Sequence, residues 1–423
     1  MAGRFSLSAA RSGVTWLRGL GWLVALAVAL LVGLWSFAIG NEFRSPARSW
    51  AAIPWSPHSA AGGNLAYLLY SARLAENPAA QVSPAEKRMS ANAYGADPLA
   101  VPALGLLALS MTDEAQQARR RSLLERTGEL SRRSSLVNYE LVKEAGLRND
   151  DRAFFTWLSR SVLTNNQART TYLAVMAEAT ARDGAVAALT PVIGPQPSWA
   201  ETYWRSLLGK SASLANGARL RIAVAGRPWG QTSISVTDRS LVQRLVGVQE
   251  FELARQLAGA LGRPGAARAD GANLLGKANL ARQPELPPFD WQLTALGNLG
   301  SSIDSDSRTL TISAIAGARG AAVRRLLHLT PGHYRLGWTL SESGFDSGEM
   351  ASNMLSADVR CAEQNVQTEN PAPVTLLQGK REAALSISDS ACRWYWLSIL
   401  VDIPDDAAGV DAQLRDISLA KSD

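Results

Sequence analysis

The pattern of apolar and polar positions divides the chain into three parts, and the first is an uncharged run near the start. Residues 19–41, "GLGWLVALAVALLVGLWSFAIGN", contain no charged side chain and lie between Arg18 and Glu42. About 20 apolar residues in a helix span the hydrocarbon core of a bilayer. The run therefore predicts a transmembrane anchor over residues 19–41.

Basic residues before this run predict its orientation. Arg4, Arg11 and Arg18 lie in residues 1–18, which the positive-inside tendency places in the cytoplasm. We therefore expect a single-pass protein of a bacterial inner membrane, with the bulk of the chain in the periplasm. A cleaved signal peptide is the alternative, because Ala38–Gly40 is an acceptable small-residue cleavage pattern. Residues 42–60 are rich in Pro, Ser and Ala and predict a linker.

The second part, residues 61–285, has mainly helical periodicity. Ser83 to Glu86 form a capping box with Pro at the first helical position, and Asp97-Pro98 is a second start signal. Residues 240–261 predict one amphipathic helix. The exception is residues 215–238, where two alternating runs around a Gly/Pro turn predict a β-hairpin-like insertion or, alternatively, the first strands of the later β-domain.

Pairs of predicted helices recur in this part. Units of two helices start at 98, 134 and 167, which are 36 and 33 residues apart. In this period, and in the placement of Tyr139, Ala145, Tyr172 and Ala179, residues 60–215 resemble tetratricopeptide repeats. The resemblance implies an α-helical solenoid with a groove for a partner protein. A plain helical bundle without a groove is the alternative.

The pattern changes at Pro287-Pro288, which ends any helix. Short alternating runs with turn residues between them then predict an antiparallel β-sandwich over residues 286–423. Alternation assigns two sets of side chains to its core: Tyr334, Leu336, Trp338 and Leu340, and Tyr395, Leu397, Ile399 and Val401. The predicted fold class is thus an α+β multidomain protein.

Three stretches of this third part resemble galactose-binding-like jelly rolls, the architecture of many carbohydrate-binding modules. They are "PFDWQ" (288–292), "LHLTPGHYRLGWTL" (327–340) and "LRDISLA" (414–420). The resemblance implies binding of a sugar by aromatic side chains and polar groups, often beside a structural Ca²⁺. Asp304 and Asp306 are the candidate carboxylates for such an ion, and a plain turn is the alternative.

The charge distribution supports a boundary between the second and third parts. The formal charge of +6 divides into +12 for residues 1–285 and −6 for residues 286–423. No basic helix interleaved with aromatic residues occurs, so we expect no nucleic-acid partner.

Cys361 and Cys392 are the two cysteines of the chain, and both are predicted to lie in strands of the third part. In an exported protein they predict a disulfide. Parity places Cys392 on one face with Trp394 and Trp396, opposite the core set that contains Tyr395. These two Trp side chains are either a glycan platform or a structural interface with the helical part.

No catalytic motif is present. The sequence contains no H-E-x-x-H or C-x-x-C metal spacing and no G-x-S-x-G elbow. Two stretches near Lys210 and Lys277 fail as phosphate loops, since each lacks a required residue. We therefore expect a scaffold or binding protein without a cofactor, acting in envelope or exopolysaccharide assembly. A hydrolase or lyase of envelope polysaccharide is the alternative.

Overall fold

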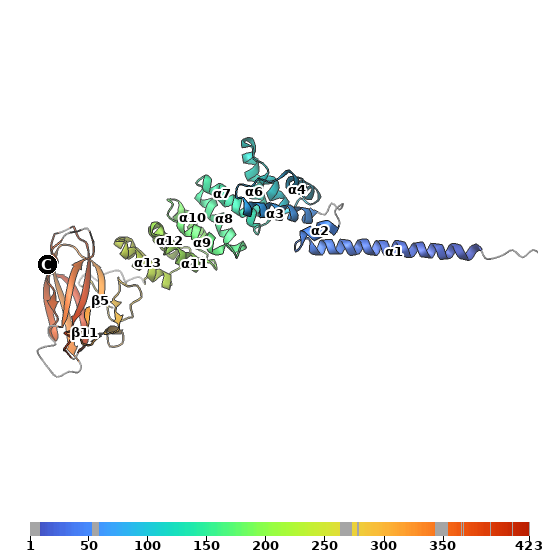
Figure 1. Cartoon of the computed structure of the whole chain (residues 1–423). Coiled ribbons are helices and arrows are strands. Elements are labelled where there is room, and N and C mark those ends of the chain that lie inside the picture. Colours follow the sequence, from blue (N-terminus) through green and yellow to red (C-terminus); the bar gives the residue numbers. More distant parts are fainter. Residues whose placement is uncertain are drawn as a thin grey trace, which may run out of the picture. The chain divides into compact units, whose positions relative to one another are not determined.

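The chain forms an α-helical region followed by two antiparallel β-sheets (Figure 1). The computed structural model describes residues 9–52, 59–262, 273–276, 279–342, 354–364, 366, 368–389, 391–407 and 409–422. They belong to two compact units, which divide between Tyr172 and Leu173. The predicted order of helices first and an antiparallel sandwich afterwards is confirmed.

The first unit begins with the predicted apolar helix, α1 (Ala9–Asn41). Its segment Gly19–Asn41 is long and apolar enough to cross a membrane, and nearly all of its side chains are exposed. An anchor and a signal sequence share these properties. Among the described residues, no second helix has this length and composition.

The segment after α1 is not the predicted linker, because it contains helix α2 (Pro46–Ala52) and the first turn of α3 (Ser59–Glu76). Residues 53–58 lie outside the described residues. The buried Ser49 hydroxyl of α2 donates to the Ala38 carbonyl in α1 at 2.7 Å. Asn64 of α3 donates to the Glu42 carbonyl at 3.1 Å. Pro46 at the start of α2 suits a first helical turn, a signal that its Ser- and Ala-rich surroundings concealed.

The remaining helices of this unit follow the predicted periodicity. Their bounds are α4 (Pro84–Ala96), α5 (Val101–Leu109), α6 (Gln117–Leu130), α7 (Ser135–Leu147) and α8 (Asp151–Thr164), and α9 (Arg169–Ala179) crosses into the second unit. The Ser83 and Glu86 capping box at α4 is confirmed. Helix α5 starts later than expected, because the Asp97 side chain accepts from the Leu99 backbone and forms a turn there.

The second unit continues with α10 (Ala185–Ile193), α11 (Ala200–Leu207), α12 (Leu214–Ala225), α13 (Val236–Gly247) and α14 (Phe251–Leu261). The predicted hairpin at 215–238 is therefore wrong. Leu220–Ala225 is the last part of α12, since a short apolar run fits a buried helical face as well as a strand. The second run leads into α13, where Ser235 and Asp238 form a capping box.

A buried ion pair connects α12 with the start of α13. Arg221 donates to both carboxylate oxygens of Asp238, at 2.7 and 3.2 Å, and each side chain is about 95% buried. The same guanidinium donates to the backbone carbonyls of Gln231 and Ser233. These four bonds hold the loop that the sequence had suggested as a hairpin turn.

The predicted single helix over 240–261 is interrupted at Val248–Glu250, between α13 and α14. Gln249 has a φ of 64°, in the left-handed region, and this residue ends the helical path. Its side chain exchanges two hydrogen bonds with Gln364, one with the side chain and one with the backbone N–H. The interruption thus places the α13–α14 turn against the sandwich.

Among the described residues, the sandwich consists of a five-stranded sheet and a six-stranded sheet. In the five-stranded sheet the order is β1 (Gln292–Leu293), β5 (Arg319–His328), β10 (Trp394–Asp402), β7 (Leu355–Cys361) and β8 (Val374–Thr375). In the six-stranded sheet it is β2 (Ala295–Leu296), β3 (Leu299–Asp304), β4 (Thr309–Ala314), β11 (Val410–Ser422), β6 (Gly332–Glu342) and β9 (Gly379–Ile387). The recorded strand pairs are antiparallel, and both predicted sets of core side chains are buried between the sheets.

The sandwich begins before the predicted boundary at residue 286. Leu275 and Leu280 belong to its hydrophobic core, and Leu274 donates its backbone N–H to the Leu419 carbonyl in β11. Arg325 faces inward beside them, donates to the Leu275 carbonyl at 3.0 Å and lies over the Trp291 ring. Burial lowers the pKa of Arg325 to about 10, so it stays cationic at neutral pH. Residues 273–276 and 279–285 therefore pack with the sandwich.

Replacement of Arg221 by Ala tests the ion pair. We expect the free energy of unfolding to fall by about 3–5 kcal/mol, because Asp238 then keeps a buried, unpaired charge. Arg219→Ala is the matched control, since Arg219 is exposed on the same helix, and its effect should stay within about 0.5 kcal/mol. Urea unfolding measures both. Equal losses in the two variants would contradict the proposed role of the pair.

Candidate functional site

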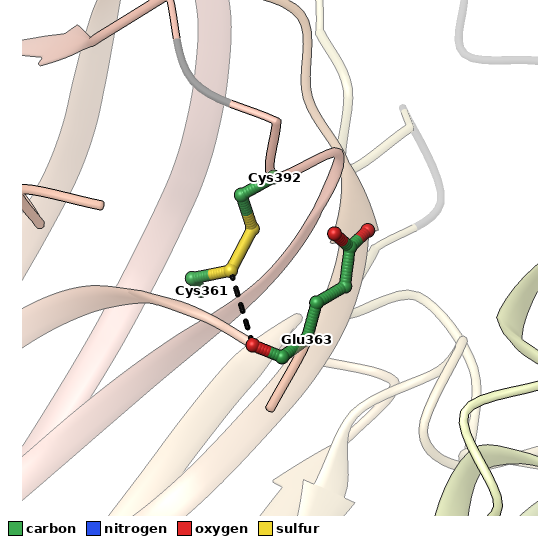
Figure 2. Close-up of side chains that lie close together, drawn as sticks. All are labelled: Cys361, Glu363 and Cys392. Atoms are coloured by element: carbon green, nitrogen blue, oxygen red, sulfur yellow. Dashed lines mark hydrogen bonds between the residues drawn. A yellow bond between two sulfur atoms is a disulfide. The ribbon is translucent and has the colours of Figure 1, made fainter. Parts of the chain in front are cut away.

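The predicted disulfide between Cys361 and Cys392 is confirmed, with a Cα–Cα distance of 6.1 Å (Figure 2). It joins the end of β7 to the residues that precede β10. The Sγ of Cys361 lies 3.7 Å from the Glu363 carbonyl oxygen, but a disulfide sulfur has no hydrogen to donate. Together with the apolar helix α1, the disulfide suggests an extracytoplasmic location.

The disulfide also decides whether the cysteines can hold a metal. The two sulfurs and the Glu363 carboxylate lie within 4.8 Å of one another, which is close enough for three ligands. Metal binding needs thiolates, and both sulfurs are already bonded to each other. The disulfide form of this group therefore offers only the Glu363 carboxylate as a ligand.

Cys392 does not share a face with the two Trp side chains, so that prediction is wrong. Strand β10 begins at Trp394, and the alternation of faces does not extend to residue 392 before it. Cys392 is 1% exposed and belongs to the core cluster between the sheets. Trp394 and Trp396 lie on the opposite, outer face of the five-stranded sheet.

Trp394 is covered by Phe251 of the helical part and by Phe289 from the segment before β1. The centre of its ring lies 5.7 Å from that of Phe251 in α14 and 6.2 Å from that of Phe289. His328 packs on it from the neighbouring strand at 5.1 Å. Trp394 is 7% exposed and forms a cluster with Phe251 and Leu326. This arrangement is a structural contact between α14 and the sheet, and it leaves little of the ring open to a sugar.

A pocket of about 360 Å³ opens beside this contact. Its lining consists of Gln249, Glu250, Phe251, Glu252, Glu363, Val366 and Trp394. Aromatic walls with polar groups at the rim are common in ligand sites. The α13–α14 turn, the first residues of α14, the segment after Cys361 and the start of β10 supply these residues.

The carboxylates of the pocket are hydrogen-bond acceptors. Arg255 donates to Glu252 at 2.6 and 3.0 Å, and this bond lowers the pKa of Glu252 against the opposing effect of burial. Glu363 accepts from the Arg393 backbone N–H at 3.2 Å. A carboxyl with a lowered pKa is a poor proton donor near neutral pH, so Glu252 suits binding better than acid catalysis.

A second polar surface lies on the outer face of the five-stranded sheet, beyond the contact with α14. In register, Trp396 faces Arg360 of β7, while Ser398 faces Arg324 of β5 on one side and Asp358 on the other. The Arg324 guanidinium lies 4.5 Å from the centre of the half-buried Trp396 ring. We call Arg324, Arg360, Asp358, Trp396 and Gln292 the outer-face strip.

The two predicted ion ligands lie elsewhere, Asp304 at the end of β3 and Asp306 in the turn that leads to β4. Asp304 accepts from the Ser307 hydroxyl at 2.7 Å and from the Asp306 backbone N–H at 3.0 Å. The hydroxyl bond is the main cause that lowers the pKa of Asp304. Among the described residues, neither aspartate belongs to a group of three or more ligating side chains.

The two arginines of the strip, Arg324 and Arg360, were not predicted from the sequence. Arg324 and Arg325 are adjacent in "VRRLLHL", and alternation alone puts one of them outside and the other inside the sandwich. The acidic pocket was not predicted either. Its residues from the helical part and its residues from the sandwich are separated by 111 or more positions in the sequence. No short motif could have indicated that contact.

Comparison with known proteins gives a distant likeness. No protein-family model matches the chain, and no curated protein is significantly similar to it. A solved structure described as "CBM4 structure and function" is 11% identical, with a TM-score of 0.24, and the match covers 32% of this chain and 88% of that one. An arabinose-bound α-L-arabinofuranosidase is 16% identical, with a TM-score of 0.25, over 36% of this chain and 27% of that one. At these TM-scores neither likeness indicates what this chain binds.

Truncation of Trp394 tests whether it is a structural contact. Trp394→Ala should lower the free energy of unfolding by about 3–5 kcal/mol, because a buried indole is replaced by a cavity beside Phe251. Trp396→Ala on the same strand should cost clearly less, since that ring is only half-buried. Denaturant unfolding of both variants measures the difference. A stable Trp394 variant would contradict the contact.

Proposed function

We propose that this protein is a membrane-anchored scaffold of the bacterial envelope that binds a glycan through its sandwich and a partner protein through its helices. Helix α1 is a single-pass anchor of the inner membrane, and the bulk of the chain lies in the periplasm. Envelope or exopolysaccharide assembly is the process that suits these parts. The observation that carries the glycan function is the outer-face strip, where a half-buried indole lies among exposed hydrogen-bond donors.

Two features support the location. Three arginines precede the apolar segment, and the disulfide requires an oxidising compartment to form and persist. The hydrogen bonds from Ser49 to Ala38 and from Asn64 to Glu42 continue directly from the apolar helix into α2 and α3. Such a continuous connection suits a retained anchor better than a segment that is removed.

The paired helices support the scaffold role. Helices α3, α5 and α7 share one small hydrophobic cluster made by Ala66, Tyr70, Leu106, Leu109 and Leu136. Tyr67 of α3 also bonds the Ser135 hydroxyl of α7, so helices distant in sequence lie side by side. Neighbouring pairs that bury each other's apolar faces are the arrangement of tetratricopeptide-like solenoids, which bind protein partners.

A polysaccharide hydrolase or lyase is the second candidate, and the pocket with Glu250, Glu252 and Glu363 is the observation that favours it. Such an enzyme would release new reducing or unsaturated ends from envelope polysaccharide. Incubation of the full chain with that polysaccharide and assay of those ends tests this candidate. Loss of the released ends in Glu363→Gln, with binding retained, would establish it.

A reporter fused after Asp423 tests the topology. Arg4, Arg11 and Arg18 precede the apolar segment. We therefore expect alkaline phosphatase fused at this position to be active, and a fluorescent protein that folds only in the cytoplasm to give no fluorescence. The fusion should stay in the membrane fraction at the full mass of the chain. Activity of the cytoplasmic reporter alone would refute the orientation, and a soluble, shortened chain would refute the anchor.

Retention of the detergent-solubilised full chain on immobilised envelope polysaccharides tests glycan binding. Trp396→Ala should weaken retention about fivefold, since loss of one aromatic contact removes about 1 kcal/mol. Tyr139→Ala is the control, because Tyr139 is an exposed aromatic residue of α7 outside the sandwich. If no polysaccharide retains the wild-type chain, the glycan function is wrong.

A further inference from the structure

The geometry points to a carboxylate-bearing sugar, such as a uronic acid, as the ligand of the outer-face strip. This inference rests on the proposed glycan function and names the class of glycan. It depends on two guanidinium groups, those of Arg324 and Arg360, which lie on the two strands that flank β10.

Each guanidinium is held through its Nε atom. The Nε of Arg324 donates to the Gln292 side-chain oxygen at 2.9 Å, and the Nε of Arg360 lies 2.5 Å from a carboxylate oxygen of Asp358. Within the described residues, the Nη groups of both arginines make no hydrogen bond. A planar guanidinium that is held at Nε presents its Nη–H donors to a carboxylate with little loss of side-chain entropy.

The strip carries local positive charge on a domain with a negative total. Among the described residues of this face, Arg319, Arg324 and Arg360 oppose Asp358 and Asp402, and Arg319 is paired with Asp402 at 3.0 Å. The Asp358 side chain is 6% exposed and lies beneath Arg360, which is 63% exposed. A ligand approaching from solvent therefore meets the guanidinium, not the carboxylate. Charges elsewhere on the sandwich are screened beyond about 8 Å at physiological salt.

The spacing and the aromatic ring favour a sugar over a free anion. Strands β5 and β7 are separated by β10 and are therefore about 10 Å apart, and Arg324 and Arg360 are offset by a further two residues along the strands. The Arg324 guanidinium lies over the Trp396 ring, 4.5 Å from its centre, and the part of this half-buried side chain that stays exposed offers an apolar surface to the C–H groups of a pyranose. Donors on both sides of an aromatic ring match an acidic oligosaccharide, in which carboxylates alternate with apolar sugar faces.

Binding of oligogalacturonate and of its carboxyl-reduced, neutral counterpart to the detergent-solubilised full chain tests this inference. We expect the wild-type chain to bind the acidic oligomer about tenfold or more tightly than the neutral one, since each charge-assisted pair is worth about this factor. Arg324→Gln and Arg360→Gln should each remove most of that preference. Arg324→Lys should keep part of it, because the charge remains and the fork is lost.

Arg335→Gln is the matched control, because Arg335 is an exposed arginine of β6 in the other sheet, paired with Glu382. It should leave the preference unchanged, and thermal unfolding of each variant should match that of the wild type. Equal binding of the acidic and neutral oligomers would overturn the inference while glycan binding itself stands. Binding of neither oligomer, with anionic lipid vesicles bound through the same arginines, would overturn it in favour of a membrane surface.

Discussion

The alternation of side chains along β10 is the constraint on which the sandwich and its candidate sites depend. This strand lies between β5 and β7, so both of its faces are in use. Tyr395, Leu397, Ile399 and Val401 point into the core, and a shift of one residue would exchange them with Trp394 and Trp396. The large inward side chains fix the register, and the register in turn fixes where the two indoles lie.

The outer face of that strand has two different roles along its length. At the Trp394 end it is covered by Phe251 of α14, and apolar burial holds the helix and the sheet together. Two residues further along, Trp396 is half-buried, and it lies beside Arg324 and Arg360. Two residues of one parity thus lie in different surroundings: Trp394 is covered by α14, whereas Trp396 is half-buried beside charged side chains.

Much of this arrangement could be predicted from the sequence where a local pattern has one meaning. The apolar helix, the capping box at Ser83, the two core sets of the sandwich and the disulfide all follow from composition, spacing or period. The hairpin failed because the run at Leu220–Ala225 suits a buried helix equally well, and Arg221 within it is buried only through its partner Asp238. That partner lies 17 residues away, which a periodicity window does not see.

The candidate sites were harder to predict because they depend on contacts between distant segments. Parity correctly separated Trp394 from Tyr395, but only the position of Phe251 shows that one indole is covered. The pocket needs the left-handed residue Gln249, which breaks a helical pattern that looks continuous in the sequence. Likewise, Leu275 and Leu280 precede the boundary that the change in charge predicted, yet they belong to the core of the sandwich. The charge of a segment reflects its exposed residues and gives no information on buried leucines.

The junction after the apolar helix has a mechanical consequence. Because the Ser49 hydroxyl donates a hydrogen bond to the Ala38 carbonyl, α2 is fixed to the end of α1 and is not joined to it only by a flexible linker. Asn64 fixes α3 in the same way through the Glu42 carbonyl. A tilt or rotation of α1 then moves α2 and α3 with it. A flexible spacer would instead let the helices move independently of α1. The orientations of α2 and α3 therefore follow the orientation of α1.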